Sequence, residues 1–311
     1  MTRSLADELH TVLITGATDG LGRATAILLA QEGFQVFAAG RNPQKRAALE
    51  QFAEEHKLPL ETIELDVTSD ASAVGAVAEI ERRAAGIDVL INNAGIAIVA
   101  PVEEIALEDL RRQFETNFIA AVRMAQCVLP GMRERRRGRI VNMSSIAAKV
   151  SNPLMGAYSA SKGALEAISD AMRLELAQFG IPVVLIEPGF IPTNMGQASA
   201  ALSSRYVQNA SASPYGRTYA GFLQMWKKVV HRARSRPEDC ARVILNAIRA
   251  ESPRTRYLVT SEAKVSNAMR RLLPDRYMDR LTLRMLGMGN ESEAPMPSVE
   301  SQVEELVRPQ S

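Results

Sequence analysis

A tyrosine and a lysine stand four residues apart in Tyr158-Ser159-Ala160-Ser161-Lys162, at the start of a segment with helical character. At that spacing on a helix both side chains share one face. A free phenol has a pKa of about 10, and a neighbouring ammonium favours the phenolate and lowers that pKa. The pair therefore predicts a general acid or base at Tyr158 that Lys162 activates. Taken alone, the pattern is at least as typical of a tyrosine that merely begins a helix.

A glycine-rich loop, Thr15-Gly16-Ala17-Thr18-Asp19-Gly20-Leu21-Gly22, joins an expected strand to an expected helix. In such a loop Gly16 permits a tight turn, Gly20 lets the backbone approach a phosphate, and Gly22 lets helix and strand pack closely. Free N–H groups at the helix start would point at the anion. The loop predicts a dinucleotide pyrophosphate site, although the glycine spacing alone also fits an ordinary strand–turn–helix corner. It is not a P-loop, because no Gly-Lys-Ser/Thr follows.

Strand-like and helix-like segments alternate along the chain, which indicates βαβ units and a parallel sheet. The strand-like runs are apolar throughout, as expected when helices cover both faces of the sheet. Strands are expected at 11–15, 34–39, 62–66, 87–91, 139–143, 182–186 and 256–260, and helices at 23–32, 43–56, 72–85, 107–135, 158–179 and 238–249.

The predicted fold class is therefore α/β, a doubly wound parallel sheet (Rossmann fold). We expect a single domain over residues 1–288, which includes a helical substrate lid at about 194–236 and a C-terminal extension. Residues 289–311 are rich in Glu, Ser and Pro, and we expect this tail to be disordered.

Composition restricts the function. The chain of 311 residues is 46% hydrophobic and 23% charged, with a formal net charge of +2, so nothing in its charge points to nucleic acid. Two cysteines and three histidines are scattered and have no metal-ligand spacing, so no metal site is expected. We see no secretory signal and no apolar run near the ~20 residues that span a membrane, and we expect a cytoplasmic protein.

Further segments make the sequence resemble the short-chain dehydrogenase/reductase family, in its single-domain branch, over roughly residues 11 to 260. The loop at 15–22 matches the family's TGxxxGxG, residues 92–95 its NNAG, and residues 188–193 its PGxxxT. Asn117 matches the helix asparagine, and Ser145 stands thirteen residues before Tyr158, as the family's catalytic serine does. The resemblance implies a metal-independent oxidoreductase that uses a nicotinamide cofactor to interconvert a carbonyl and an alcohol.

The resemblance implies that Asn117, Ser145, Tyr158 and Lys162 form the catalytic set. Tyr158 would protonate the carbonyl oxygen as hydride arrives, while Ser145 holds that oxygen. Lys162 would lower the pKa of Tyr158 and bind the nicotinamide ribose, and Asn117 would kink its helix and hold a water that relays protons to Lys162. The expected cofactor-binding residues are Gly16, Thr18, Asp19, Gly20, Leu21, Gly22, Arg41, Asp66, Val67, Asn93, Ala94, Gly95, Tyr158, Lys162, Pro188, Gly189, Ile191 and Thr193.

The cofactor is expected to be NADP(H), with NAD(H) as the alternative. Enzymes that use NAD carry Asp or Glu at the end of the second strand, where this chain has Gly40 followed by Arg41. A guanidinium can pair with a 2′-phosphate that a carboxylate would repel. One departure is Asp19, which stands where NADP-preferring relatives often have Arg or Lys; we expect it to cap the first helix.

The substrate is expected to be a hydrophobic carbonyl or alcohol. Besides Ser145 and Tyr158, the expected substrate contacts are Met195, Phe222 and Trp226 in the apolar lid. The alternative is that half of the lid's apolar residues only pack it onto the body. The regions around Arg256-Tyr257 and at 272–276 are similar to retinol and 17β-hydroxysteroid dehydrogenase-like relatives, which implies a steroid, retinoid or other bulky substrate.

Other functions stay open. The chain could act on a sugar or small polar ketone, or serve as a non-catalytic cofactor-binding regulator. The basic segments at 133–139 and 270–284 are typical of a solvated surface, and the alternative is peripheral contact with an anionic membrane. A homo-oligomer through helices 107–135 and 158–179 is a further interpretation, beside a monomer whose C-terminal extension covers that interface.

Overall fold

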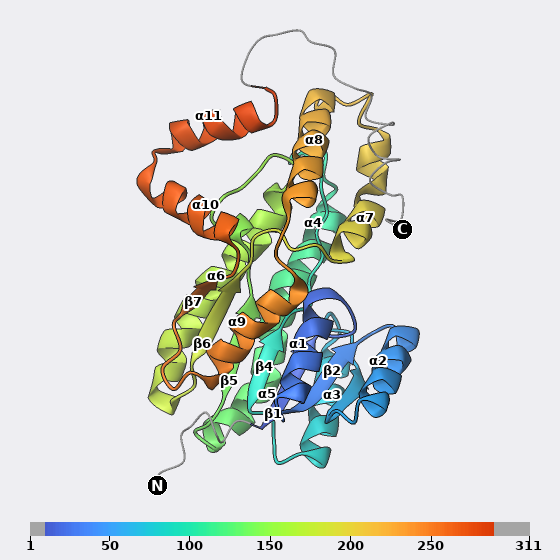
Figure 1. The fold of residues 1–311 in the computed structure, drawn as a ribbon, viewed down its shortest axis with the longest axis vertical. Helices are drawn as coiled ribbons and strands as arrows, with labels where there is room; N and C mark the ends of the chain where they lie inside the picture. Colours follow the sequence, from blue (N-terminus) through green and yellow to red (C-terminus); the bar gives the residue numbers. More distant parts are fainter. Residues whose placement is uncertain (1–9, 289–311) are drawn as a thin grey trace.

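One parallel sheet with helices on both faces organises residues 10–288, the part of the chain that the computed structural model describes (Figure 1). Within this range the sheet has seven strands in the order β3-β2-β1-β4-β5-β6-β7. The strands are β1 (Thr11–Thr15), β2 (Gln35–Gly40), β3 (Leu60–Glu64), β4 (Val89–Asn92), β5 (Arg139–Met143), β6 (Val183–Glu187) and β7 (Arg256–Leu258).

The strand order reverses between β1 and β4, which pair directly through Val12↔Val89 and Ile14↔Ile91. The chain runs from β1 outward to β3 and then returns to β4 on the other side of β1. At such a switch point the loops beyond the carboxyl ends diverge and leave a crevice that commonly binds a ligand. The predicted doubly wound fold is confirmed.

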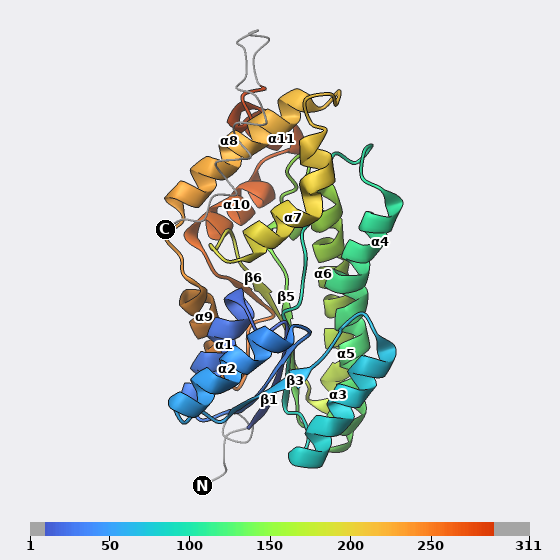
Figure 2. The same cartoon turned by 90° about the vertical axis from the view of Figure 1, so that its right-hand side faces the viewer.

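Two apolar cores cover the two faces of the sheet (Figure 2). In β1, Val12 and Ile14 lie in one core and Leu13 in the other, and all three are fully buried. Since successive strand residues point to opposite faces, this explains why the central strands are apolar throughout. One face holds α1 (Gly20–Gln31), α2 (Pro43–Glu55) and α9 (Pro237–Arg249), and the other holds α3 (Asp70–Arg83), α5 (Ala120–Glu134) and α6 (Gly156–Leu176).

Side-chain caps start the first two helices, which follow β1 and β2. The Asp19 carboxylate accepts from the N–H of Gly20 at 2.7 Å and begins α1, as predicted. Asn42 accepts from the N–H of Lys45 at 2.8 Å and begins α2. These oxygens satisfy N–H groups that have no partner within the helix, so the chain turns sharply from strand to helix at the carboxyl edge of the sheet.

The helix predicted over 107–135 is interrupted. It consists of α4 (Leu107–Phe114), a π-helical turn (Glu115–Ile119) and α5. Asn117 lies in the π-helical turn and is buried. A single extra residue in a helical turn widens it and re-aims the side chains around it, and such turns are frequent at functional sites. The apolar periodicity continues through the turn, which is why the sequence predicted one helix.

Four further helices lie beyond the carboxyl ends of the strands (Figure 1). Two of them, α7 (Met195–Gln208) and α8 (Gly216–Arg232), occupy the stretch predicted as a lid. The other two, α10 (Ser261–Leu272) and α11 (Asp275–Met285), were not predicted. Each buries a single residue, Ala263 or Met278, although Val265, Met269 and Leu272 of α10 are spaced as on one apolar helix face.

β1 and β5 have the predicted boundaries, and the boundaries of the other strands differ by at most two residues from those predicted. The largest shift is at β3, predicted at 62–66 and observed at Leu60–Glu64. This edge strand pairs with β2 alone, through Val36↔Leu60, and only Leu60 and Ile63 of its five residues are buried, so its apolar pattern is weak. The predicted tail at 289–311 lies outside the described residues. Among residues 10–288, no helix has the length and apolarity that a bilayer crossing requires.

Candidate active site

The predicted catalytic residues meet where the carboxyl end of β5 touches the start of α6. Tyr158 and Lys162 lie one turn apart on α6, and the Lys162 Nζ is 5.9 Å from the centre of the Tyr158 ring. Ser145 follows β5 and shares a hydrogen bond with Tyr158. Lys162 donates to the backbone carbonyl of Met143, the last residue of β5, at 2.7 Å. These contacts bring Ser145, Tyr158 and Lys162 into one cluster, as the sequence predicted.

Asn117 joins the cluster from the π-helical turn. Its amide forms two hydrogen bonds with the backbone of Ile96, accepting from N–H at 2.8 Å and donating to C=O at 2.9 Å. It also donates to the hydroxyl of Ser161 on α6 at 3.0 Å. A Cβ added to Gly95 would lie 3.3 Å from the Asn117 Oδ1 and 3.6 Å from the Lys162 Nζ. Gly95 therefore separates the asparagine from the lysine with little space to spare.

Burial dominates the electrostatics of the two ionisable groups. It raises the pKa of the Tyr158 phenol above its ordinary value, and the hydrogen bond with Ser145 opposes that rise. Burial also lowers the pKa of Lys162 to about 8. In this structure the desolvation of the phenol outweighs the contact that opposes it, and the expected lowering of the Tyr158 pKa by Lys162 stays a prediction.

The glycine-rich loop is shaped as predicted. Gly16 and Gly20 have φ angles of +62° and +51°, a left-handed conformation that side-chain-bearing residues rarely adopt. A Cβ on Gly22 would overlap the Gly16 carbonyl oxygen, so no larger residue fits there. The N–H groups at the start of α1 face the space above this loop, where the helix dipole favours an anion.

The loop after β4 is fastened to the glycine-rich loop. The Asn93 side chain donates to the carbonyls of Thr15 and Gly16, at 2.9 and 3.0 Å. The Thr15 hydroxyl accepts from the N–H groups of Asn93 and Ala94, each at 3.0 Å. Thr15 was part of the predicted motif but was given no role of its own. These bonds join the ends of β1 and β4 at the switch point.

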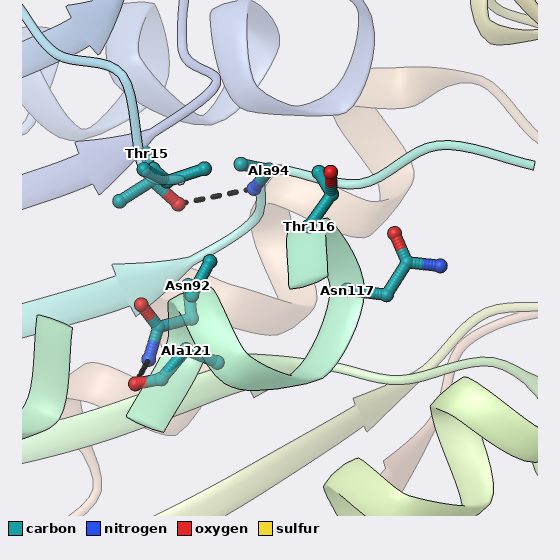
Figure 3. A pocket seen from close by; sticks show the side chains of 8 residues that line it. Thr15, Asn92, Ala94, Thr116, Asn117 and Ala121 are labelled. Carbon is teal, nitrogen blue, oxygen red and sulfur yellow. Dashed lines mark hydrogen bonds between the residues drawn. The ribbon is translucent and has the colours of Figure 1, made fainter. Parts of the chain in front are cut away.

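A small pocket opens beside this junction (Figure 3). Thr15 and Ala94 lie at one side of it, and Thr116 and Asn117 project from the π-helical turn at the other. Below them, the Asn92 amide donates to the carbonyl of Ala121 on α5 at 3.2 Å. The pocket therefore lies between the predicted cofactor loop and the predicted catalytic asparagine. Val67, another predicted cofactor residue, also lines it.

Charged groups gather at the end of β2. The Arg41 guanidinium lies 3.7 Å from the Asp66 carboxylate; the Arg41 side chain is exposed and that of Asp66 is half-buried. Asp66 also accepts from the N–H and hydroxyl of Thr68, which together with Arg41 hold its pKa below the ordinary value in spite of burial. Thr18 lies against Gly40, since a Cβ on that glycine would be 2.6 Å from the Thr18 methyl group. These residues line one rim of the crevice.

Asp19 does more than cap α1. Its carboxylate forms an ion pair with Lys45 on α2 and accepts from the Asn194 amide at 2.9 Å. These contacts outweigh partial burial and lower the Asp19 pKa. Neither partner was predicted, since Lys45 looked like part of a solvated helix start and Asn194 lies 175 positions along the chain. Asp19 thus links the glycine-rich loop to the residue before α7.

The segment after β6 faces the glycine-rich loop. A Cβ on Gly20 would lie 3.3 Å from the Cβ of Thr193. The carbonyl of Pro188 accepts from the N–H of Ile146 at 2.9 Å, beside Ser145. Ile191 is buried, and Gly189 packs against the hydroxyl of Thr260. The predicted cofactor residues at 188–193 therefore span the distance from the serine to the glycines.

The predicted substrate residues occupy different environments. Phe222 is 5% exposed and stacks on Trp226, with ring centres 6.0 Å apart. Trp226 also meets Phe190 edge-on, with ring centres 4.8 Å apart. Met195 is 40% exposed. Phe222 thus belongs to the packing that joins α8 to the body, in line with the packing alternative, while Trp226 extends the apolar surface toward the segment after β6.

The basic segment at 133–139 is largely engaged within the protein. The guanidinium groups of Arg135 and Arg136 donate to the carbonyls of Ile87 and Gln178. Arg137 pairs with Asp88 at 2.8 Å, and Arg139 is buried against carbonyls at the end of α9. These contacts favour a structural role over membrane contact here. Among residues 10–288, no group of three or more His, Cys, Asp and Glu side chains is placed to hold a metal ion.

Comparison with known proteins assigns the family. A family model described as short chain dehydrogenase matches residues 10–202, more than half of the chain. The chain belongs to the short-chain dehydrogenases. It is an oxidoreductase of the NAD(P)-dependent dehydrogenase/reductase type, as the motifs predicted.

Three similar proteins illustrate the breadth of the family. The NADPH-dependent 3-dehydrocapnine reductase of Ornithobacterium rhinotracheale is 32% identical over 86% of this chain and 94% of its own. Retinol dehydrogenase 8 of Bos taurus is 33% identical over 80% of this chain and 81% of its own. The crystal structure of actinorhodin polyketide ketoreductase with NADPH superposes with a TM-score of 0.70 at 28% identity and covers 82% of this chain and 97% of its own.

The lowered pKa of Lys162 predicts a pH dependence of stability. The unfolded lysine, with a pKa near 10.5, binds a proton more tightly than the folded one, with a pKa of about 8. The contribution of Lys162 to the free energy of unfolding therefore rises as the pH increases from about 8 to about 10.5. Relative to Lys162→Met, the wild-type free energy of unfolding should gain about 2 kcal/mol between pH 7.5 and 10, as measured by urea unfolding. A constant difference would contradict the burial of the amine.

Proposed function

We propose that this short-chain dehydrogenase uses NADP(H) to reduce a hydrophobic carbonyl, or to oxidise the matching alcohol, with Tyr158 as the proton donor or acceptor. The observation that carries the proposal is the convergence of Ser145, Tyr158, Lys162 and Asn117 beside the glycine-rich loop. A serine hydroxyl, a phenol and an amine within one cluster can bind a carbonyl oxygen and supply its proton.

The glycine-rich loop fits a dinucleotide. Gly16 and Gly20 take left-handed backbone conformations, Gly22 allows close packing, and the loop opens directly onto the N-terminus of α1, where a pyrophosphate would bind. When bound, the cofactor supplies or accepts the hydride. Residues of the segment after β6, from Pro188 to Thr193, would hold its nicotinamide end near Ser145 and Tyr158.

The proton chemistry follows from burial. A phenol whose pKa is raised keeps its proton at neutral pH, so Tyr158 would hold the proton that a carbonyl oxygen takes up on reduction. The hydrogen bond with Ser145 holds the phenol toward the oxygen that receives the proton. Lys162 and Asn117, which both border Gly95, would resupply Tyr158 from the solvent side through a bound water.

The preference for NADP(H) rests on Arg41. Its exposed guanidinium at the end of β2 can pair with a 2′-phosphate, and two of the similar proteins carry NADPH in their names. Asp19 would repel that phosphate, but its charge is offset by Lys45. NAD(H) is the competing cofactor.

Replacement of Arg41 tests the cofactor preference. For Arg41→Ala we expect kcat/KM with NADPH to fall at least 10-fold, because a charge-assisted pair contributes about 1.5–3 kcal/mol, and kcat/KM with NADH to change less than 2-fold. Steady-state kinetics with both cofactors provide the measurement. Arg249→Ala, which removes a surface ion pair with Glu32, is the matched control. A wild-type enzyme that prefers NADH would overturn the assignment.

The substrate class rests on the apolar surface of the lid helices. Trp226 and Phe190 form an edge-to-face pair, and Met195 is exposed at the start of α7. A retinol dehydrogenase stands among the similar proteins. We propose a steroid-, retinoid- or lipid-like substrate, with α7 and α8 as the lid. The competing interpretation is a sugar or small polar ketone, which turnover of small polar ketones alone would favour.

Replacement of Tyr158 tests the reaction mechanism. Tyr158→Phe should fold and bind NADPH but lose at least 10²-fold in kcat, since general acid catalysis contributes typically 10²–10⁴-fold. Tyr277→Phe, at a tyrosine 58% exposed on α11, is the matched control and should keep wild-type kcat. Cofactor binding is followed by fluorescence and turnover by NADPH oxidation. Full activity of Tyr158→Phe would refute the proton-donor role.

Small molecules are the partners that this proposal requires. We propose that the enzyme is cytoplasmic and does not act on nucleic acid. We also propose that copies of the chain associate through α5 and α6. Exposed apolar side chains include Ile119, the last residue of the π-helical turn before α5, and Leu174 on α6, at 41% and 70% exposure. A non-catalytic regulator would bind NADPH without turnover.

A further inference from the structure

Helix α6 contacts β5 through a stripe of side chains that continues past the predicted catalytic residues. Tyr158, Lys162 and Glu166 are spaced four residues apart and so share one face. Their partners are three consecutive residues, the last of β5 and the two that follow it. Lys162 donates to the carbonyl of Met143, Glu166 accepts from the hydroxyl of Ser144 at 2.8 Å, and Tyr158 shares a hydrogen bond with Ser145. The contact between Glu166 and Ser144, which the sequence did not predict, fixes how α6 lies against the end of β5 and so holds the other two contacts in place.

Glu166 is also the centre of a charged cluster. Its second oxygen accepts from Lys149 at 2.8 Å and from Arg256 at 2.6 Å. Both cations also reach Glu187 at the end of β6, at 2.9 and 3.1 Å. Arg256 extends from β7 to Asp170, one turn beyond Glu166 on α6. The cluster therefore joins α6, β6, β7 and the residue that follows the 3₁₀ turn Ile146–Ala148.

Two carboxylates at the centre of the cluster are buried, and the charges of the cluster are nearly balanced. Glu187 is 1% exposed and Glu166 9%, and two cations face three carboxylates. A carboxylate without its partner is strongly disfavoured at such a position, so the geometry has little freedom. Because its charged side chains have few other positions open to them, the cluster restrains the backbone segments that carry them.

The backbone it holds is that of Ser145. On one side of the serine, Ser144 binds Glu166 through its hydroxyl and Ile186 through its N–H, the latter at 2.8 Å. On the other side, Ile146 donates to the carbonyl of Pro188 at 2.9 Å, and Lys149 reaches the two carboxylates. Ser145 therefore sits in a short segment that the cluster restrains at both ends.

We infer that Glu166, Lys149, Glu187 and Arg256 are positioning residues that set the distance between Ser145 and Tyr158 and hold the turn at Pro188 against them. The inference rests on the proposed function. None of the four touches the phenol or the glycine-rich loop in the described contacts, so they act through Ser145 and Pro188. Small displacements of reacting groups, of about 1 Å, can cost about 10²-fold in rate.

Two substitutions perturb the cluster with little change in shape. Glu166→Gln keeps an acceptor for Ser144 and removes the charge, and Lys149→Met removes the ammonium. Each should lower kcat about 10-fold or more and leave the dissociation constant of NADPH within 3-fold. Lys149→Arg keeps the charge and should restore kcat to within 3-fold of the wild type.

A double-mutant cycle separates positioning from loss of stability. If Glu166 acts through Ser145, Glu166→Gln should cost less than 2-fold in kcat when made in a Ser145→Ala background. Asp88→Asn is the matched control, because Asp88 is a buried carboxylate paired with Arg137 just before β4, at the amino ends of the strands and away from the site. It should lower the thermal midpoint and leave kcat within 2-fold.

The outcomes are distinguishable. Wild-type protein without turnover on any carbonyl would refute the proposed function and this inference with it. With an active wild type, additive losses of kcat from Glu166→Gln and Ser145→Ala in the cycle would refute the positioning role alone. So would wild-type kcat in both Glu166→Gln and Lys149→Met, whatever their thermal midpoints.

Discussion

The fit of one helix face against the end of one strand determines the site. Lys162 binds the carbonyl of Met143, Tyr158 bonds to Ser145, and Glu166 binds Ser144. Because a helix repeats every 3.6 residues and side chains four apart share a face, three such contacts fix both the rotation and the height of α6 on the sheet. The orientation of the phenol relative to the serine follows from that fit.

Hydrogen bonds also hold the loops on the side of the site where the cofactor is proposed to bind. The bonds among Thr15, Asn93 and Gly16 tie β1 to β4, and Asn117 ties the next residues of the same loop to α6 through Ser161. These hydrogen bonds, together with the backbone of residues 94–96, thus connect the glycine-rich loop to α6. Loops beyond parallel strands bind ligands well only when such bonds hold them in place. The π-helical turn contributes by aiming Asn117 at the backbone of Ile96.

Much of this could be predicted because it is local in the sequence. Apolar runs define the central strands, Asp19 precedes its helix as a cap, and Tyr158 and Lys162 lie within one turn. Contacts between segments that are distant in the sequence could not be predicted from local patterns. Asn194 meets Asp19, and Arg256 meets Glu166, only because the sheet brings their elements together. The raised pKa of Tyr158 depends on burial, which no spacing of residues reveals.

The most direct test of the central claim is the oxidation of NADPH by the wild-type protein with a panel of carbonyl compounds. The panel should contain steroid, retinoid, fatty and sugar carbonyls at equal concentration. The account predicts turnover with at least one bulky apolar carbonyl and formation of the corresponding alcohol. Tight binding of NADPH with no turnover across the whole panel would contradict it.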